Sequence, residues 1–212
     1  RQKKAAFICC MLMILQQLGG INAIVFYTST IFESTGVDID PKVSTIIFGA
    51  LQMFATFLST IAVDRLGRKL LLIISNIGAG VSVAILAVFF TLQSRNILDA
   101  STLSKLGFIP LVTLSIYVVS FALGMSPIPW VLSAELFPPE INSIGSALAG
   151  VISWFFAFLV TKFYFDVQAA IGIDITYYLF AGVLILTLVF VCFFVPETKG
   201  KTLAEIQKEL TE

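Results

Sequence analysis

Histidine is absent from the 212 residues of this chain, and charged residues make up only 12% of it. Without histidine there is no imidazole for a catalytic triad, for most zinc sites or for a proton relay. The three cysteines lie in apolar runs, at spacings that indicate neither a disulfide framework nor a metal site. Thirteen basic and thirteen acidic residues leave no net charge, so no basic field points to nucleic acid. We therefore expect no metal, no cofactor and no catalytic residue.

Hydrophobic residues are abundant: they make up 58% of the chain, and its mean hydropathy is +0.99. Soluble domains contain about 45–50% apolar residues, so a water-soluble fold of this length could not bury so much apolar surface. Six stretches are long enough to cross a bilayer, which takes about 20 mostly apolar residues. These stretches are residues 5–31, 43–63, 70–92, 108–132, 144–164 and 176–195.

The six stretches are apolar on nearly all faces, which predicts spanning α-helices, because backbone polar groups in a bilayer must be satisfied within the segment. A soluble bundle would show amphipathic stripes, and a β-barrel would show alternating segments of about ten residues. The predicted fold class is an all-α integral membrane protein, with a bundle of six transmembrane helices over residues 1–198. In the tail, residues 199–212, Leu203, Ile206 and Leu210 predict a short amphipathic helix.

Basic residues are distributed unevenly between the two sides of this predicted bundle. Nine lie on the side that holds both termini and the loops at 64–69 and 135–142. Four lie on the side that holds residues 33–42, 93–107 and 162–174. Because basic residues collect on the cytoplasmic side, both termini are predicted to be cytoplasmic. The plasma membrane is the expected location.

Neutral polar side chains occur at mid-membrane depth. Gln16, Gln17 and Asn22 lie in the first span beside a pair of glycines, Gln52 lies in the second, and Trp130 follows two prolines in the fourth. Amides and an aromatic face suit an uncharged polyhydroxylated ligand. The alternative is that the amides only hold helices together. The glycines and the prolines each predict an interrupted helix, as is common where transporter helices line a binding site.

Charged residues gather on the predicted cytoplasmic side. The loop at 64–69 contains Asp64, Arg65 and Arg68, while Glu135 follows the fourth span and Glu197 follows the sixth. One interpretation is a solvated surface loop. The other is a cytoplasmic gate, whose ion pairs hold the helix ends together and break when the gate opens. Contacts that differ between two states bias the equilibrium between them.

Five segments together resemble the sugar porter family of the major facilitator superfamily. They are QQLGGIN at 16–22, DRLGRK at 64–69, PIPW at 127–130, AELFP at 134–138 and PETKG at 196–200. Their order and their places at helix ends are those of the C-terminal six-helix half of the twelve-helix major facilitator fold. The absence of acidic residues from the span centres and the AELFPPEI segment look most similar to insect facilitated trehalose transporters.

The resemblance implies roles for individual residues. It implies sugar contacts for Gln16, Gln17, Asn22, Gln52, Phe121 and Trp130, an outer lid of Phe26 and Tyr27, and a cytoplasmic gate of Asp64, Arg65, Arg68, Glu135 and Glu197. Ser153 and Ala157 stand where animal glucose carriers have asparagines, and Asn142 stands where the loop usually has arginine. The first departure favours a different or larger sugar. The second favours weaker ion pairing at the cytoplasmic gate.

The resemblance implies a transporter rather than an enzyme: a facilitated hexose or trehalose uniporter that works by alternating access, with this chain supplying the C-terminal half-site. The expected partners are a small sugar, the lipid bilayer, and either an N-terminal six-helix half or a second copy of this chain. No nucleic acid is expected. Two alternatives remain open, a proton-coupled sugar symporter and a non-transporting membrane scaffold derived from a truncated transporter.

Overall fold

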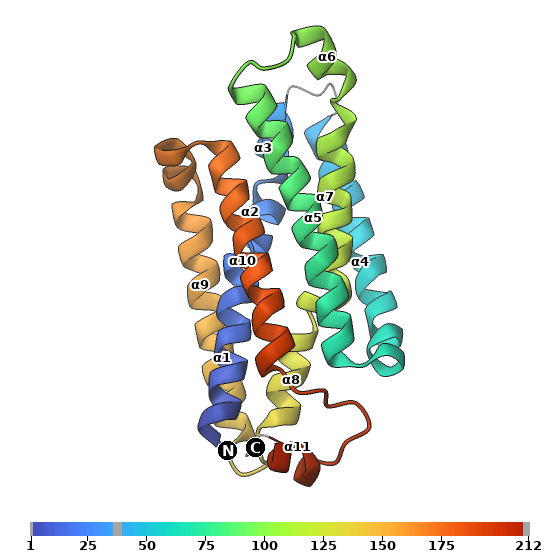
Figure 1. The fold of residues 1–212 in the computed structure, drawn as a ribbon, viewed down its shortest axis with the longest axis vertical. Helices are drawn as coiled ribbons and strands as arrows, with labels where there is room; N and C mark the ends of the chain where they lie inside the picture. Colours follow the sequence, from blue (N-terminus) through green and yellow to red (C-terminus); the bar gives the residue numbers. More distant parts are fainter. Residues whose placement is uncertain (1, 36–39, 210–212) are drawn as a thin grey trace.

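A computed structural model describes residues 2–35 and 40–209, and all regular structure within them is helical. Arg1, part of the predicted 33–42 segment and Leu210 lie outside the described residues. The elements, shown in Figure 1, are α1 (Gln2–Leu18), α2 (Ile21–Phe26), α3 (Thr28–Thr35), α4 (Pro41–Leu66), α5 (Arg68–Ser94), α6 (Ala100–Lys105), α7 (Phe108–Ser120), the π-helix η1 (Phe121–Met125), α8 (Ile128–Leu136), α9 (Asn142–Ile171), α10 (Ile173–Phe194) and α11 (Leu203–Glu209).

The prediction of six spanning helices is confirmed. Within residues 2–35 and 40–209, six helical segments are long and apolar enough to cross a membrane, and each one contains or overlaps one predicted stretch. Their large side chains are extensively exposed, for example Phe57 on α4 and Leu186 on α10, both more than half exposed. Such an apolar exterior is stable in lipid and would not be in water.

The first predicted span is interrupted where the glycines fall. Gly19 and Gly20 form a turn between α1 and α2, and Gly20 has φ +89°, a left-handed value that favours glycine. A side chain at Gly20 would also collide with the ring of Phe180, whose carbons lie 2.8 Å from the position of an added Cβ. A second turn at Tyr27 separates α2 from α3.

The fourth predicted span is interrupted at its prolines. It consists of α7, the π-helix η1 and α8, and Pro127 lies in the turn between η1 and α8. Proline has no N–H to continue the helical ladder. The widened π-turn is the local response, because Ser126 N–H donates to the Phe121 carbonyl, five residues back, at 2.8 Å.

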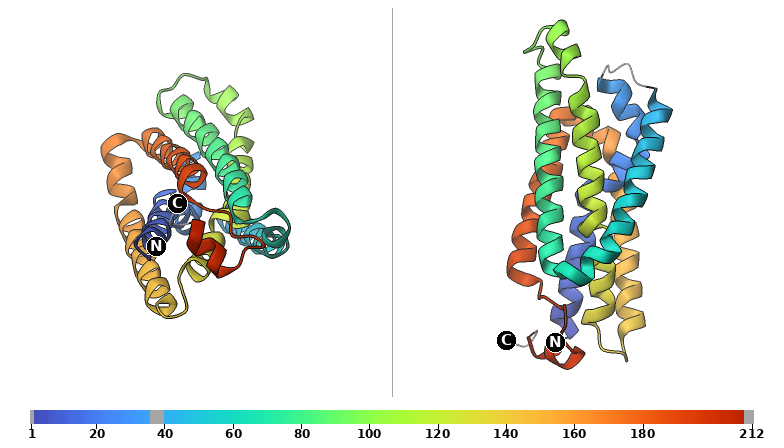
Figure 2. Two further views of the ribbon diagram at one scale, coloured as in Figure 1. Left: turned by 60° about the horizontal axis from the view of Figure 1, so that its bottom comes forward. Right: turned by 90° about the vertical axis from the view of Figure 1, so that its right-hand side faces the viewer.

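The helices form an elongated bundle, with the start of α1, the end of α8, the α4–α5 turn and α11 at one end (Figures 1 and 2). α10 packs mainly against α5, and α1 packs mainly against α9. The face of α9 toward the interior carries small buried residues, namely Ala149, Ser153 and Ala157, which let α1 approach closely.

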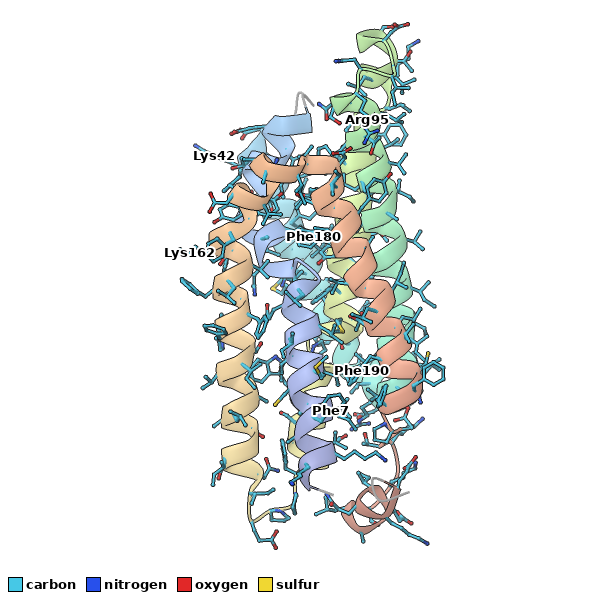
Figure 3. The ribbon with its side chains drawn as sticks, turned by 60° about the vertical axis from the view of Figure 1, so that its left-hand side comes forward. Phe7, Lys42, Arg95, Lys162, Phe180 and Phe190 are labelled. Atoms are coloured by element: carbon cyan, nitrogen blue, oxygen red, sulfur yellow. The ribbon has the colours of Figure 1, made fainter. Side chains whose placement is uncertain are left out.

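The predicted outer connection at residues 162–174 is wrong in detail, because α9 continues to Ile171 and only Gly172 separates it from α10. Lys162 stays in the helix because its long stem places the ammonium over the rings of Phe158 and Phe163, at 5.4 and 5.5 Å. Figure 3 shows Lys162, with Lys42 and Arg95, toward the end of the bundle opposite α11.

Candidate functional site

A cluster of three amide side chains surrounds the break in the first span. Gln16 and Gln17 are 3% and 7% exposed, and Asn22 is partly buried. Asn22 Nδ2 donates to Gln17 Oε1, and Gln17 Nε2 donates to Ser153 Oγ on α9 at 2.8 Å. Gln17 Nε2 also lies 3.5 Å from Gln16 Oε1. The structure therefore brings all three predicted amides into one hydrogen-bonded chain, with Asn22 at its accessible end.

Gln16 lies at the other end of this series of hydrogen bonds, next to the fourth span. Its Nε2 donates to the Met125 carbonyl at 2.8 Å and to the Ser126 carbonyl at 2.9 Å. Gln16 thus joins the two interrupted helices. Because an amide has two N–H donors, both donors of Gln16 are engaged by the backbone.

Trp130 lies on α8, close to this cluster. Its ring is within 3.6 Å of the position of an added Cβ on Gly150, a residue of α9. Gly150 and Ser153 are three residues apart, so they share one face of α9. Trp130 and Gln17 therefore contact the same face of α9, about one turn apart. Trp130 remains 40% exposed, which leaves part of an aromatic face available to a ligand.

Gln52 and Phe121 do not join the hydrogen bonds of the amide cluster within the described residues. Gln52 lies on α4 and is partly exposed, and no hydrogen bond from its side chain to the cluster is present among the described residues. Phe121 is 1% exposed, and its ring packs against that of Tyr117 at 5.6 Å. The Tyr117 hydroxyl in turn donates to the Gly19 carbonyl at 2.8 Å. This hydrogen bond stabilises the turn between α1 and α2.

The two predicted lid residues differ in their surroundings. Phe26 is 66% exposed. Tyr27 is held against α9: its hydroxyl donates to the Thr161 carbonyl at 3.1 Å, and its ring stacks on that of Tyr164 at 5.4 Å. In this conformation Tyr27 therefore ties the outer part of the first span to the fifth.

Arg68 is the centre of the charged cluster at the end that holds α11. Its guanidinium donates to Glu135 Oε1 from Nη2 at 2.8 Å and from Nε at 3.2 Å, and its Nη1 lies 3.7 Å from Asp64. Glu135 also accepts a hydrogen bond from the Thr198 hydroxyl at 2.6 Å. The ends of α5 and α8 and the segment after α10 are thus joined through one carboxylate.

Glu197 has a different role from the ion pairing that the sequence suggested. Its carboxylate accepts the backbone N–H groups of Arg68, Lys69 and Lys199 at 2.9–3.0 Å, so it caps the start of α5. Partial burial alone would raise the pKa of this carboxyl, but the backbone donors outweigh burial and lower the pKa below its ordinary value of 4.5. Gly67, with φ +89°, leaves the space that the carboxylate occupies.

Arg65, the remaining residue predicted for the gate, is exposed, and its backbone carbonyl accepts a hydrogen bond from Lys199 Nζ at 2.6 Å. Asn142 donates to the Ala134 carbonyl at 2.8 Å and so closes the loop after α8. Sequence reasoning missed Thr198 as a partner of Glu135. It also missed Ser59, whose hydroxyl binds the backbone of η1.

Comparison with known proteins gives consistent results for the whole chain. The family described as "Sugar (and other) transporter" matches residues 1–210. The facilitated trehalose transporter Tret1 of Anopheles gambiae is 40% identical over 199 residues, which cover 94% of this chain and 25% of that relative. The Bombyx mori protein of the same name is 40% identical over 211 residues, covering 100% of this chain and 41% of that relative.

Solved structures of the xylose transporter XylE share the fold. A double tryptophan mutant of XylE has a TM-score of 0.85 at 29% identity, covering 98% of this chain and 43% of that one. The proton:xylose symporter XylE bound to 6-bromo-6-deoxy-D-glucose has a TM-score of 0.80 at 31% identity, covering 97% and 42%. The chain therefore spans between a quarter and about two fifths of the length of the proteins it matches.

Proposed function

We propose that this chain, which belongs to the sugar transporter family, forms one half of the sugar-binding site of a facilitated sugar transporter. The proposal rests on the hydrogen-bonded amide cluster of Gln16, Gln17 and Asn22 at the break in the first span, next to the partly exposed Trp130. Asn22 and Gln17 offer donors and acceptors to sugar hydroxyls, and the Trp130 face suits the C–H face of a sugar ring. No bond is made or broken, so the chain has no enzymatic activity.

The proposed transport mode is uniport of a hexose or of trehalose. Support comes from the relatives in Anopheles gambiae and Bombyx mori, which are facilitated trehalose transporters. In the described residues, the acidic side chains that lie on membrane helices are near helix ends, such as Asp64 on α4, Asp166 on α9 and Asp174 on α10. No carboxylate at mid-membrane depth is thus available in this part of the chain to carry a coupled proton. XylE, a proton:xylose symporter, keeps symport as the second candidate.

The site proposed here needs a second six-helix unit to enclose the sugar. α4 and α9 are the least buried spans, with 17% and 22% of their apolar windows buried. α9 contacts the amide cluster through Ser153, and α4 contacts η1 through Ser59. We propose that an N-terminal half or a second copy of the chain covers this face. We also propose that the α11 end faces the cytoplasm and that the protein resides in the plasma membrane.

Binding to the purified chain in lipid nanodiscs tests the site. Radiolabelled trehalose and glucose are the probes, and Trp130→Leu and Gln17→Leu are the variants. Leaving a sugar hydroxyl unpaired costs roughly 1–3 kcal/mol, so we expect at least a severalfold loss of affinity in Gln17→Leu. Phe193→Leu, an aromatic substitution at a site 80% exposed on the far end of α10, is the matched control.

The outcomes separate the candidate functions. Loss of affinity in both variants, with the control unchanged, supports the sugar site. Wild-type affinity in both variants refutes it. If the unaltered chain binds neither sugar, alone or with the N-terminal half of a relative, the scaffold hypothesis replaces the transporter hypothesis. Uptake that depends on an imposed pH gradient would favour symport.

A further inference from the structure

Two backbone carbonyls in the fourth span lack the donors that an α-helix would give them. The carbonyl of residue i normally accepts from the N–H of residue i+4. Pro127 and Pro129 have no N–H, so the carbonyls of Leu123 and Met125 lose these donors. Inside a membrane an unsatisfied carbonyl is costly, because no water is available to replace the missing donor.

Each of these carbonyls is supplied by a side chain from another span. Ser59 Oγ, on α4, donates to the Leu123 carbonyl at 2.5 Å. Gln16 Nε2, on α1, donates to the Met125 carbonyl at 2.8 Å. Both side chains are almost fully buried, at 2% and 3% exposure. Gln16 Nε2 also donates to the Ser126 carbonyl at 2.9 Å, so one of its two N–H donors replaces the missing N–H of Pro129. The two replacement donors, from Ser59 and Gln16, come from different helices.

A third side chain stabilises the π-turn itself. Ser75 Oγ, on α5, donates to the Ser120 carbonyl at 2.6 Å and accepts the Met125 N–H at 2.9 Å, so it bridges the two ends of η1. Gly124 allows this approach, because an added Cβ there would lie 2.6 Å from Ser75 Cβ. The interruption is therefore held in one geometry by three spans.

We propose that Gln16 is a positioning residue that replaces the missing N–H of Pro129 and thereby sets the direction of α8. α8 begins at Ile128, and Trp130 is its third residue, so the anchor lies within two turns of the ring. Ser59 has the same role for Pro127. Resting on the proposed function, this removes the N–H donors of Gln16 from direct contact with sugar, since both are already engaged by backbone carbonyls.

The one-to-one pairing of donors and prolines gives a rescue test. Ser126 and Pro127 have right-handed helical backbone angles, with φ of −74° and −83°. An alanine at position 129 would therefore present its N–H to the Met125 carbonyl without a change of backbone. Pro129→Ala should rescue Gln16→Leu, and Pro127→Ala should rescue Ser59→Ala. The crossed pair, Gln16→Leu with Pro127→Ala, is the matched control and should not be rescued.

Trp130 itself serves as the reporter. The chain contains two tryptophans, so a Trp154→Phe background leaves Trp130 as the only indole. The purified chain in nanodiscs is measured without sugar, by the Trp130 emission maximum and the thermal midpoint. Gln16→Leu should shift the emission and lower the midpoint by roughly 2–10 °C. Pro129→Ala should reverse most of both changes, because it replaces the bond to the Met125 carbonyl but not the bond to the Ser126 carbonyl.

Sugar affinity supplies the second readout. Gln16→Leu should weaken glucose or trehalose binding about tenfold through the displaced indole, and Pro129→Ala should restore affinity to within about twofold. A Gln16→Leu chain that folds only when combined with Pro129→Ala also supports the proposal. It is overturned if Pro129→Ala rescues no better than Pro127→Ala, or if Gln16→Leu leaves the Trp130 emission unchanged. Absence of sugar binding in every chain would remove the proposed function without affecting the emission test.

Discussion

Substituting Gly20 by alanine tests whether the break in the first span is built into the fold. Gly20 has φ +89°, and its added Cβ would lie 2.8 Å from two ring carbons of Phe180. That ring cannot easily withdraw. Phe180 is 8% exposed and packs edge-on against Tyr177 at 5.8 Å, while Tyr164 lies parallel to it at 6.4 Å.

Two separate costs add in Gly20→Ala. A left-handed backbone costs a residue with a Cβ roughly 1–2 kcal/mol, and overpacking against a fixed ring costs roughly 1–3 kcal/mol. We expect a total destabilisation of about 2–5 kcal/mol. Gly182→Ala is the matched control, since Gly182 is exposed within α10 and nothing lies within 4 Å of its added Cβ. Alanine there should stabilise the helix by about 0.5–1 kcal/mol.

Denaturant unfolding of the purified chain in detergent, followed by circular dichroism, measures both variants. A Phe180→Ala background removes the collision, because every colliding ring atom lies beyond Cβ, and keeps the backbone strain, so there Gly20→Ala should cost only about 1–2 kcal/mol. The reasoning is refuted if Gly20→Ala is as stable as Gly182→Ala. An equal cost in both backgrounds would show that the ring contributes nothing.

Three further predictions concern the cluster near α11 and the support behind the helix break. Glu135→Gln should destabilise the chain by roughly 1–3 kcal/mol, since it removes the charge from the hydrogen bonds that Arg68 donates; the loss should shrink at high salt. The lowered pKa of Glu197 gives stability that is fully present above pH 4.5 and is lost as pH falls through the folded-state pKa; Glu197→Gln should abolish this acid dependence in a pH series of unfolding curves. Tyr117→Phe should cost about 1 kcal/mol by thermal unfolding, because a buried carbonyl loses its donor, whereas Tyr178→Phe, at a 43% exposed site, should be neutral.

The spans and their interruptions could be predicted from the sequence because both depend on local rules. A bilayer requires about 20 apolar residues in a row, and that length is read directly from the chain. Gly20 and Pro127 act on their own backbone, so the breaks also follow from residue type. The end of α9 was misplaced, because the predicted span ends at residue 164 whereas the helix continues to Ile171.

The partners of each polar side chain were decided only by the tertiary structure. The sequence by itself determined that Gln16 and Glu197 are polar groups at particular depths, and that they needed partners. It did not indicate that Gln16 would reach a carbonyl 109 residues away, or that Glu197 would cap a helix that begins 129 residues earlier. The reason is physical: hydrogen bonds form over about 3 Å, and which groups come that close depends on how whole helices pack.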